Sequence, residues 1–431
     1  MADPADIYRS LPIAHRADVV VIGGGPAGFG AAVAAAEEGA DTLLIERWGF
    51  LGGTATAGGV NPFMRYMSGE VVVNAGVFGR VLEALDERGA RGGRDISDRE
   101  RRQFDPEVLK ILLDEMALAA GARLLLHSFM VEAVASDGRV ERAVIANKSG
   151  LQAVEADLFI DASGDADLAA RAGAEFEMGR DEDGLCQPMS LFFRTAGVDT
   201  DRLPTYEQIN ELYRPEKAAG RIDNPRDDVH GAIFTTHPGE ITHNATRILA
   251  HDGTDAVSLT DAELQGRRQI RELMTFFKDK VPGFENACIG SIAAQVGVRE
   301  TRRVIGDYVL TRDDFEQAAK FEDAVARGCF SIDIHSPTGH GLYGQRMPEG
   351  DWYDIPYRCL TPKGVDNLLV AGRPISCDHY IHGSLRVMPI AMSTGEAAGV
   401  AAAMAAADDL TTRGVDVAAL RERLRARGAS V

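Results

Sequence analysis

Residues 17–46, ADVVVIGGGPAGFGAAVAAAEEGADTLLIE, constrain the fold more than any other part of the chain. The β-branched run over 19–22 predicts a strand, the alanine-rich run that follows the glycines predicts a helix, and 42–45 predicts a second strand. A strand, a helix and a second strand in immediate succession form a βαβ unit, whose two strands lie parallel in one sheet. The segment therefore predicts an α/β fold built on a parallel sheet.

The turn between the first strand and the helix has the pattern Gly23-x-Gly25-x-x-Gly28. Gly23 suits a tight turn, Gly25 allows a pyrophosphate to approach the backbone at the helix N-terminus, and Gly28 allows close helix packing. Glu46 follows Gly28 at close to the usual spacing of about 20 residues, where an acid accepts hydrogen bonds from a ribose. The unit thus predicts a dinucleotide site, to which we also assign Pro26, Ala27 and Arg47; the alternative is a turn with a purely structural role.

Three later segments indicate which dinucleotide binds. Gly52, Gly53 and Thr54 follow the acid closely, and the strands expected at 158–160 and 368–370 each run into a glycine-containing turn. An extended FAD contacts segments far apart in the sequence, whereas a nicotinamide dinucleotide needs only one βαβ unit. We therefore expect FAD, although either later strand alone also fits an interior strand that ends in a turn. The residues assigned to the cofactor from these later turns are Ala162, Gly164, Asp165 and Gly372.

The charge and the cysteines exclude several other classes of protein. A formal net charge of −19 disfavours contact with nucleic acids and anionic membranes. The five cysteines are widely spaced without a CxxC pair, which argues against a disulfide framework and against a zinc site. The N-terminal segment lacks the apolar run of a signal peptide. We expect a cytoplasmic protein without a metal site and without nucleic-acid or membrane partners.

Near the C-terminus, residues 382–399 read HGSLRVMPIAMSTGEAAG. Pro389 suits the first turn of a helix, and the small residues that follow would allow this helix to lie very close to another element. A histidine and an arginine directly precede this helix, and its packing alone does not explain them. A resemblance to a known family suggests a function for both.

The chain resembles the FAD-dependent oxidoreductase family of the glutathione-reductase-like fold, in the branch of the succinate dehydrogenase and fumarate reductase flavoproteins. The blocks that carry the resemblance are VVIGGGPAGFGAA, LLIERWGFLGGTATAGGV, DLFIDASGDADLAARAG, VGVRETRRVIGDYVL and NLLVAGRPISCDHYIHGSLRVMPIAMSTGEAAG. The resemblance implies that the C-terminal helix points its positive end at the flavin. It also implies cofactor contacts at Val131, Ser384, Met388 and Ala391.

By the same resemblance, His382 to Arg386 match an HGxxR element in which the arginine binds a substrate carboxylate. A guanidinium forms bidentate pairs with carboxylates that lysine cannot form. His335 and His340 lie where the family places a substrate-binding histidine, although a histidine in such a loop equally serves to bond backbone carbonyls. Arg299 and Arg302 would share a face if this segment were helical, and we expect at least one neighbouring arginine to be buried with an acid partner. The predicted catalytic residues are Arg386, His382, His335, His340 and Arg299.

The chain divides into three segments that form two domains. Residues 1–175 and 291–431 are predicted to be the two parts of a Rossmann-like FAD-binding domain with an antiparallel β-meander. Residues 176–290 are predicted to form a smaller α+β substrate or cap domain. Residues 61–125 are expected to be helical, and the arginines of the C-terminal helix to be solvated. LGGTATAGG lacks the histidine that tethers flavin in the classical members of the branch, so FAD should be noncovalent.

The predicted function is hydride transfer between FAD and a small polar substrate that bears a carboxylate or hydroxyl group. The second partner in the reaction is an electron acceptor or donor that the sequence does not identify, and a homo-oligomer is compatible with it. The alternatives are a flavin-dependent oxidase or monooxygenase, and a flavin-binding electron carrier without an organic substrate.

Overall fold

The computed structural model describes residues 4–92, 103–229, 233–339 and 341–431. Its largest sheet has the strand order β5-β2-β1-β8-β7-β6, and β19 pairs with the C-terminal half of β8. Five strands are parallel: β5 (Arg123–Leu125), β2 (Thr42–Ile45), β1 (Ile13–Ile22), β8 (Gly150–Asp161) and β19 (Leu368–Val370). The prediction of an α/β fold with a parallel sheet is confirmed.

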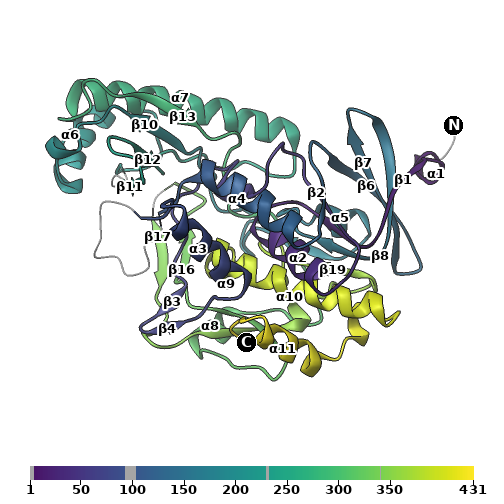
Figure 1. Ribbon diagram of the computed structural model, residues 1–431. Coiled ribbons are helices and arrows are strands. Elements are labelled where there is room, and N and C mark those ends of the chain that lie inside the picture. The colour runs from purple at the N-terminus through teal and green to yellow at the C-terminus, as the bar shows by residue number, and fades with distance from the viewer. Residues whose placement is uncertain (1–3, 93–102, 230–232, 340) are drawn as a thin grey trace.

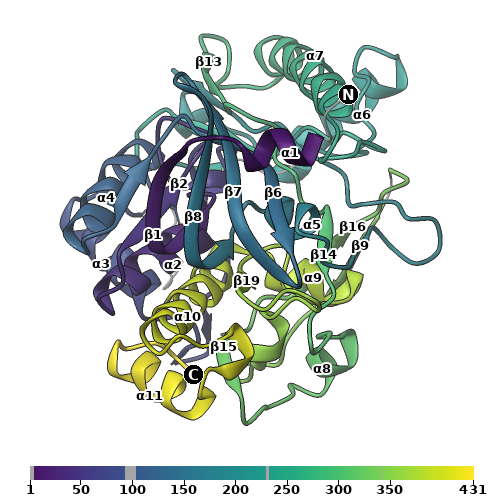
Figure 2. The same ribbon diagram turned by 90° about the vertical axis from the view of Figure 1, so that its right-hand side faces the viewer.

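An antiparallel meander extends this sheet through β6 (Phe129–Ser136), β7 (Arg139–Asn147) and the first half of β8. Figure 2 shows β1, β8, β7 and β6 side by side, with the short N-terminal α1 (Pro4–Arg9) crossing them. The carboxyl ends of β1, β2, β8 and β19 lie at one edge of the sheet, which is where ligands bind in open α/β folds.

Two helices of small residues pack against each other on this sheet, α2 (Pro26–Glu37) and α10 (Met388–Ala407). A Cβ at Gly395 would lie 1.9 Å from the carbonyl oxygen of Ala27, and one at Gly399 would lie 2.2 Å from that of Ala31. The glycines therefore set how closely the two helices approach. Among the described residues, α10 is also the helix that is long and apolar enough to cross a membrane, and it is mostly buried inside the protein.

The other helices around the first core are α3 (Val77–Glu87), α4 (Pro106–Ala119), α5 (Asp167–Arg171), α8 (Arg312–Glu316), α9 (His379–Leu385) and α11 (Val417–Ala426). The helical prediction for 61–125 is correct for α3 and α4. It is wrong for the start of that range, where β3 (Met67–Ser68) and β4 (Val71–Val72) form a hairpin around Gly69, which has a φ of +59°. It is also wrong for the end of the range, where β5 is a strand, and residues 93–102 lie outside the described residues.

The expectation of solvated arginines on the C-terminal helix is also wrong in part. The Arg427 side chain is only 12% exposed and pairs with Glu37, Glu38 and Glu396, so the tail is fastened to the ends of α2 and α10. Arg423, by contrast, is half exposed.

A second hydrophobic core, formed by residues between Met189 and Val296, lies apart from the first. Its sheet has the order β11-β12-β10-β13, with all strands antiparallel. The long helix α7 (Ala256–Lys280) covers it, as Figure 1 shows, with α6 (Tyr206–Ala218) at one end. The four strands are β10 (Phe193–Ala196), β11 (Ile233–Phe234), β12 (Ile241–His243) and β13 (Cys288–Ile292).

Short antiparallel pairs connect this second unit to the first sheet and its helices. The pairs are β9 (Phe176–Met178) with β14 (Arg302–Val304), β15 (Ala324–Gly328) with β18 (Tyr353–Pro356), and β16 (Ile332–His335) with β17 (Leu342–Gln345). Because Arg302 lies in a strand, the helical face once expected for Arg299 and Arg302 does not exist. The β16 pair brings His335 toward the second core.

Candidate active site

A cavity of about 490 Å³ follows the carboxyl ends of the parallel strands. Its walls come from segments far apart in the sequence, including the first glycine turn, the turns after β8 and β19, and the start of α10. The predicted residues that line it are Gly23, Gly25, Pro26, Ala27, Glu46, Arg47, Gly53, Thr54, Ala162, Gly164, Asp165, Arg299, Gly372, Arg386, Met388 and Ala391.

The glycine turn at the centre of this cavity has the geometry that its spacing predicted. Gly23 has a φ of +98°, and a Cβ on Gly28 would lie 1.7 Å from the carbonyl oxygen of Gly23. Gly28 thus stands behind the turn and keeps it tight rather than lining the cavity. Gly25 and Pro26 begin α2 at the cavity wall, so the positive end of that helix lies where a pyrophosphate would bind.

At one end of the cavity, Glu46 accepts hydrogen bonds from the backbone amides of Gly24 and Trp48, at 2.6 and 2.9 Å. Burial raises the pKa of Glu46, while those amide bonds oppose the rise. A recess of about 50 Å³ shares Glu46 and Arg47 with the main cavity, and Met130 lines it. Val131, the predicted adenine contact, is the next residue along β6 and does not line this recess.

The turn after β8 holds a second carboxylate at the cavity wall. Asp165 accepts hydrogen bonds from the Thr301 hydroxyl at 2.8 Å and from the Arg373 guanidinium at 2.5 Å. Arg373, which also lines the cavity, was not predicted, although it directly follows Gly372 at the end of β19. Gly52 supports the opposite wall without lining it, since its amide donates to the carbonyl oxygen of Gly24 at 2.8 Å.

At the far end of the cavity, Met388 and Ala391 place the first turn of α10 on the wall. Val387, the N-cap residue of this helix, supplies no capping side chain. The amides and the positive end of α10 are therefore available to a ligand with negative charge. The small residues of α10 have a structural role here. The glycines let α10 pack closely on α2, and this packing places the N-terminus of α10, with Arg386 just before it, at the cavity.

A second cavity, of about 150 Å³, adjoins the first and shares Thr54, Gly297, Val298, Arg299, Arg386 and Met388 with it. Its remaining wall is partly apolar, with side chains such as Met64, Phe192 and Phe330, and partly polar, with Asn244, Asp333 and His335. A cavity with an apolar wall and a few convergent polar groups is typical of a small-molecule site.

Two guanidiniums lie on the shared wall. Arg299 donates to the carbonyl oxygen of Pro188 at 2.5 Å and to Oδ1 of Asn244 at 3.4 Å. Arg386 donates to the carbonyl oxygen of Asp333 at 3.2 Å, and its buried Nε has no hydrogen-bond partner among the described residues. Burial and the charge of Arg386 lower the pKa of Arg299 to about 9. Arg299 therefore stays cationic at neutral pH, and burial also lowers the pKa of Arg386 from its ordinary value.

Asp333 is the acidic residue among the described residues of this second wall. Its Oδ2 lies 3.8 Å from Nη2 of Arg386 and 3.5 Å from Nε2 of His335. Burial opposes ionisation, but the contact with His335 and the charges of both arginines outweigh it and lower the pKa of Asp333. The sequence contained a signal for this residue, because Asp333 and His335 are two apart on β16 and so face the same side.

Of the predicted histidines that the structure describes, His335 lines the second cavity. Burial and the charge of Arg299 lower the pKa of His335 to about 3. His382 lines neither cavity; its ring is fully buried and its Nε2 lies 3.2 Å from the carbonyl oxygen of Arg373. His382 therefore supports the loop that carries Arg373. His340 lies outside the described residues.

Ser384, assigned to the cofactor from the resemblance, is also away from both cavities. Its hydroxyl donates to the carbonyl oxygen of Phe330 at 2.6 Å and lies 2.8 Å from the Tyr353 hydroxyl. Arg303 is the buried arginine expected near Arg299, since it pairs with Glu300 at 2.6 Å. All five cysteines are free thiols.

The family model described as FAD dependent oxidoreductase matches residues 18–424, so the chain belongs to this family. The predictions of the family and of FAD as the cofactor are thereby confirmed. Among curated relatives, the dihydrolipoyl dehydrogenase of Trypanosoma brucei brucei is 48% identical over 54 residues, 12% of this chain and 11% of the relative. The thiamine thiazole synthase of Aeropyrum pernix is 32% identical over 140 residues, 32% of this chain and 47% of the relative. The matches thus span less than half of either relative.

Solved structures are similar over more of the chain. A geranylgeranyl bacteriochlorophyll reductase-like protein from Thermoplasma acidophilum is 14% identical, with 96% of this chain and 84% of that chain covered and a TM-score of 0.46. An L-proline dehydrogenase from P. horikoshii is 13% identical, with 97% and 100% covered and a TM-score of 0.44.

The residues of the first cavity fit FAD. Tight glycine turns leave backbone atoms at its centre, Glu46 lies at one end for a ribose, and two helix N-termini face it. The unpartnered Nε of Arg386 and the start of α10 lie at the opposite end, beside the second cavity. The ring system of the cofactor would therefore lie at the wall that the two cavities share.

Proposed function

We propose that this FAD-dependent oxidoreductase transfers a hydride between noncovalently bound flavin and a small organic substrate that bears a carboxylate, and that the substrate binds in the second cavity. The observation that carries the proposal is the shared wall, where Arg299 and Arg386 lie together beside one carboxylate, Asp333. Two cations and one anion leave a net positive charge. An anionic substrate group would neutralise this charge at the edge of the cofactor cavity.

The bound FAD supplies a two-electron acceptor or donor. The chain's own residues perform the rest of the task. Arg386 has an unused donor at Nε and binds the substrate carboxylate, while Arg299 stays fixed by Pro188 and Asn244 and adds a second charge. The apolar side chains of Met64, Phe192 and Phe330 limit the water around the substrate.

Asp333 is the group in the second cavity that accepts the proton released when the substrate is oxidised. Its carboxylate is ionised because the neighbouring cations lower its pKa. A substrate carboxylate that binds Arg386 would take part of that cationic stabilisation away from Asp333, and so raise the pKa of Asp333 toward its ordinary value. Substrate binding would therefore make Asp333 a stronger base.

The predicted cap domain, residues 176–290, contains most of the second core. In this proposal it closes the second cavity, which is the substrate cavity. It contributes Phe192 and Asn244 to the wall. The electron partner that completes the catalytic cycle is a separate molecule in this account. The noncovalent link follows from the glycine-rich segment 51–59, which has no histidine to form a tether.

The test is anaerobic mixing of the FAD-loaded protein with small carboxylic acids, hydroxy acids, alcohols and amines, followed by the flavin absorbance. We expect bleaching of oxidised FAD by a substrate that donates hydride, or recovery of the absorbance of chemically reduced FAD by one that accepts it, only with compounds that bear a carboxylate. Bleaching by uncharged compounds alone would refute the anionic site. Peroxide or an oxygenated product on admission of air would identify an oxidase or a monooxygenase instead.

A further inference from the structure

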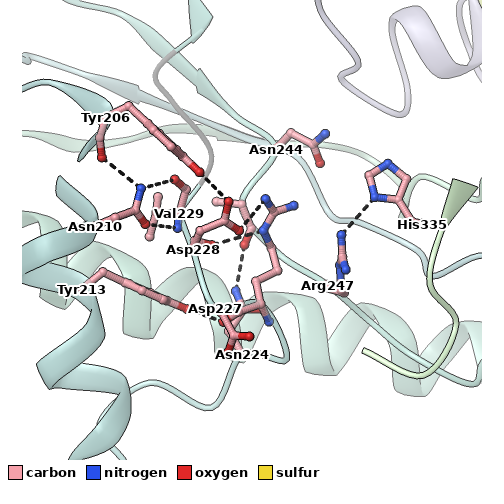
Figure 3. A network of polar contacts seen from close by, with 12 residues as sticks. Tyr206, Asn210, Tyr213, Asn224, Asp227, Asp228, Val229, Asn244, Arg247 and His335 are labelled. Carbon is pink, nitrogen blue, oxygen red and sulfur yellow. Dashed lines mark hydrogen bonds and ion pairs between the residues drawn. The ribbon is translucent and has the colours of Figure 1, made fainter. Parts of the chain in front are cut away.

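Arg247 directly precedes Ile248 of the second core, yet its side chain reaches His335 in the substrate cavity. Its backbone amide donates to Oε1 of Gln269 at 2.9 Å, and Nε2 of Gln269 donates back to its carbonyl oxygen at 2.8 Å. Gln269 is buried in α7, so the helix that covers the second sheet fixes the position of Arg247. Figure 3 shows Arg247 pointing at His335, beside the polar network that includes Asn224 and Asp228.

The guanidinium of Arg247 makes two contacts across the boundary between the cores. Nη1 donates to the carbonyl oxygen of Gly339 at 3.0 Å, and Nη2 lies 2.9 Å from Nδ1 of His335. A guanidinium carries donors and no acceptor. Nδ1 of His335 must therefore present a lone pair, which places the single ring proton of a neutral imidazole on Nε2.

The balance of charges around the ring fits this assignment. Burial and the charges of Arg299 and Arg386 disfavour a second proton on His335 and outweigh Asp333, which favours one. Asp333 lies 3.5 Å from Nε2, on the side away from the contact with Arg247. A proton on Nε2 points toward that carboxylate and the cavity. A proton on Nδ1 would instead face a donor and leave Nε2 without a proton beside Asp333.

We propose that Arg247 is a positioning residue that holds His335 as a neutral imidazole with its proton on Nε2, so that His335 donates a hydrogen bond into the substrate cavity. This inference rests on the proposed function. It assigns the substrate an oxygen that accepts a hydrogen bond at Nε2, as a carboxylate or a carbonyl does. It also removes His335 as a base, which leaves the proton-accepting role to Asp333.

The test is ¹H–¹⁵N correlation spectroscopy of the imidazole nitrogens in the FAD-loaded protein with ¹⁵N-labelled histidine and no substrate. The His335 signals are assigned by their loss in His335→Gln. We expect a protonated Nε2 and an unprotonated Nδ1 from about pH 5 to about pH 8. In Arg247→Met, Nδ1 loses its donor, and the tautomer with the proton on Nδ1 should become populated.

Arg271→Met is the matched control, because Arg271 is an exposed arginine on the same α7. It should leave the His335 signals unchanged. A wild-type spectrum with a proton on Nδ1, or with a cationic ring, would overturn the proposal, as would an Arg247→Met spectrum equal to that of the wild type. The tautomer of His335 in the wild-type protein tests the proposal by itself, so the test stands even if Arg247→Met fails to fold.

The outcome is independent of turnover. If no carboxylate bleaches the flavin, the proposed function fails while the tautomer of His335 is still measured. If carboxylates do bleach the flavin but Nδ1 is protonated, only the role of Arg247 fails.

Discussion

The two adjoining cavities differ in the atoms that form their walls. Around the cofactor cavity, glycines and helix N-termini expose backbone, and the spacing of α2 and α10 depends on Gly395 and Gly399. Around the substrate cavity, the polar wall consists of side chains such as Arg386, Asp333 and His335. The first region should therefore respond to substitutions through stability and FAD binding, and the second through substrate binding and pH dependence.

The largest expected effect lies in the first region. In Gly395→Ala the new Cβ would lie 1.9 Å from the carbonyl oxygen of Ala27, so α10 must shift off α2. We expect a loss of about 3 kcal/mol in the free energy of unfolding and a loss of FAD. Denaturant unfolding and the flavin absorbance measure the two.

Gly79→Ala on α3 is the control, since a Cβ there meets nothing within 4 Å. It should stabilise the protein by about 0.5–1 kcal/mol, because alanine loses less backbone freedom in a helix. Equal effects of the two variants would show that the packing of α2 against α10 does not depend on glycine.

The next largest effect, that of Arg386→Met on turnover, distinguishes the substrate cavity from the cofactor cavity. Arg386→Met removes the carboxylate partner, and a hydrogen bond to a charged group is worth about 1.5–3 kcal/mol, so kcat/KM should fall about tenfold to about a hundredfold. Bound FAD should remain, because backbone and Glu46 hold it. If FAD is lost and kcat/KM per bound flavin is unchanged, Arg386 belongs to the cofactor site alone.

Acid pH should act on the substrate cavity through His335. Burial and Arg299 lower the pKa of His335 to about 3, below the ordinary value of about 6.5. The unfolded chain then binds a proton first as the pH falls, so stability is complete above about pH 6.5 and declines from there toward about pH 3. His335→Gln should weaken this decline between about pH 7 and about pH 5 in urea unfolding.

His243 provides the comparison within the second core. Burial alone lowers the pKa of His243 to about 3, where its ring stacks between Phe193 and Phe277. His243→Gln should therefore also weaken the acid decline. A decline unaltered by either substitution would mean that neither ring has a lower pKa in the folded protein than in the unfolded chain.

The smallest effects on stability are expected at the arginines of the C-terminal tail. Arg427 is largely buried against Glu37, Glu38 and Glu396, so Arg427→Met should cost about 1–3 kcal/mol in denaturant unfolding. Arg423 is half exposed beside Glu38, so Arg423→Met should cost less than about 1 kcal/mol. Equal costs would remove the distinction between the anchored and the solvated face of α11.

The contrast between the cavities also explains what the sequence could predict. The turn at Gly23 and the close approach of α10 to another element depend on local spacing, so the sequence predicts both, but it does not identify α2 as the element that α10 packs against. The arrangement of Asp333, Arg299 and Arg247 around His335 depends on three segments that only tertiary structure brings together. The region 61–76 was predicted to be helical together with the rest of 61–125, although the periodic apolar pattern lies in 105–122 and Gly69 forms a turn.

His382 shows the limit of a resemblance. Its motif position implied catalysis, yet its buried ring bonds to the backbone of Arg373. Arg373, which lies in a matching block but was assigned no role, lines the cofactor cavity instead. Burial and partner decide the role of such a residue, and neither is visible in the spacing of one sequence.

The central claim is that noncovalent FAD lies beside a carboxylate site formed by Arg386. Its most direct test is an anaerobic titration of the FAD-loaded wild type and of Arg386→Met with small carboxylates, followed by flavin absorbance and by the flavin released on acid precipitation. The account predicts FAD in the supernatant of both proteins, and a saturable spectral change or bleaching in the wild type that Arg386→Met lacks. The same response in both proteins, or flavin retained in the pellet, would contradict it.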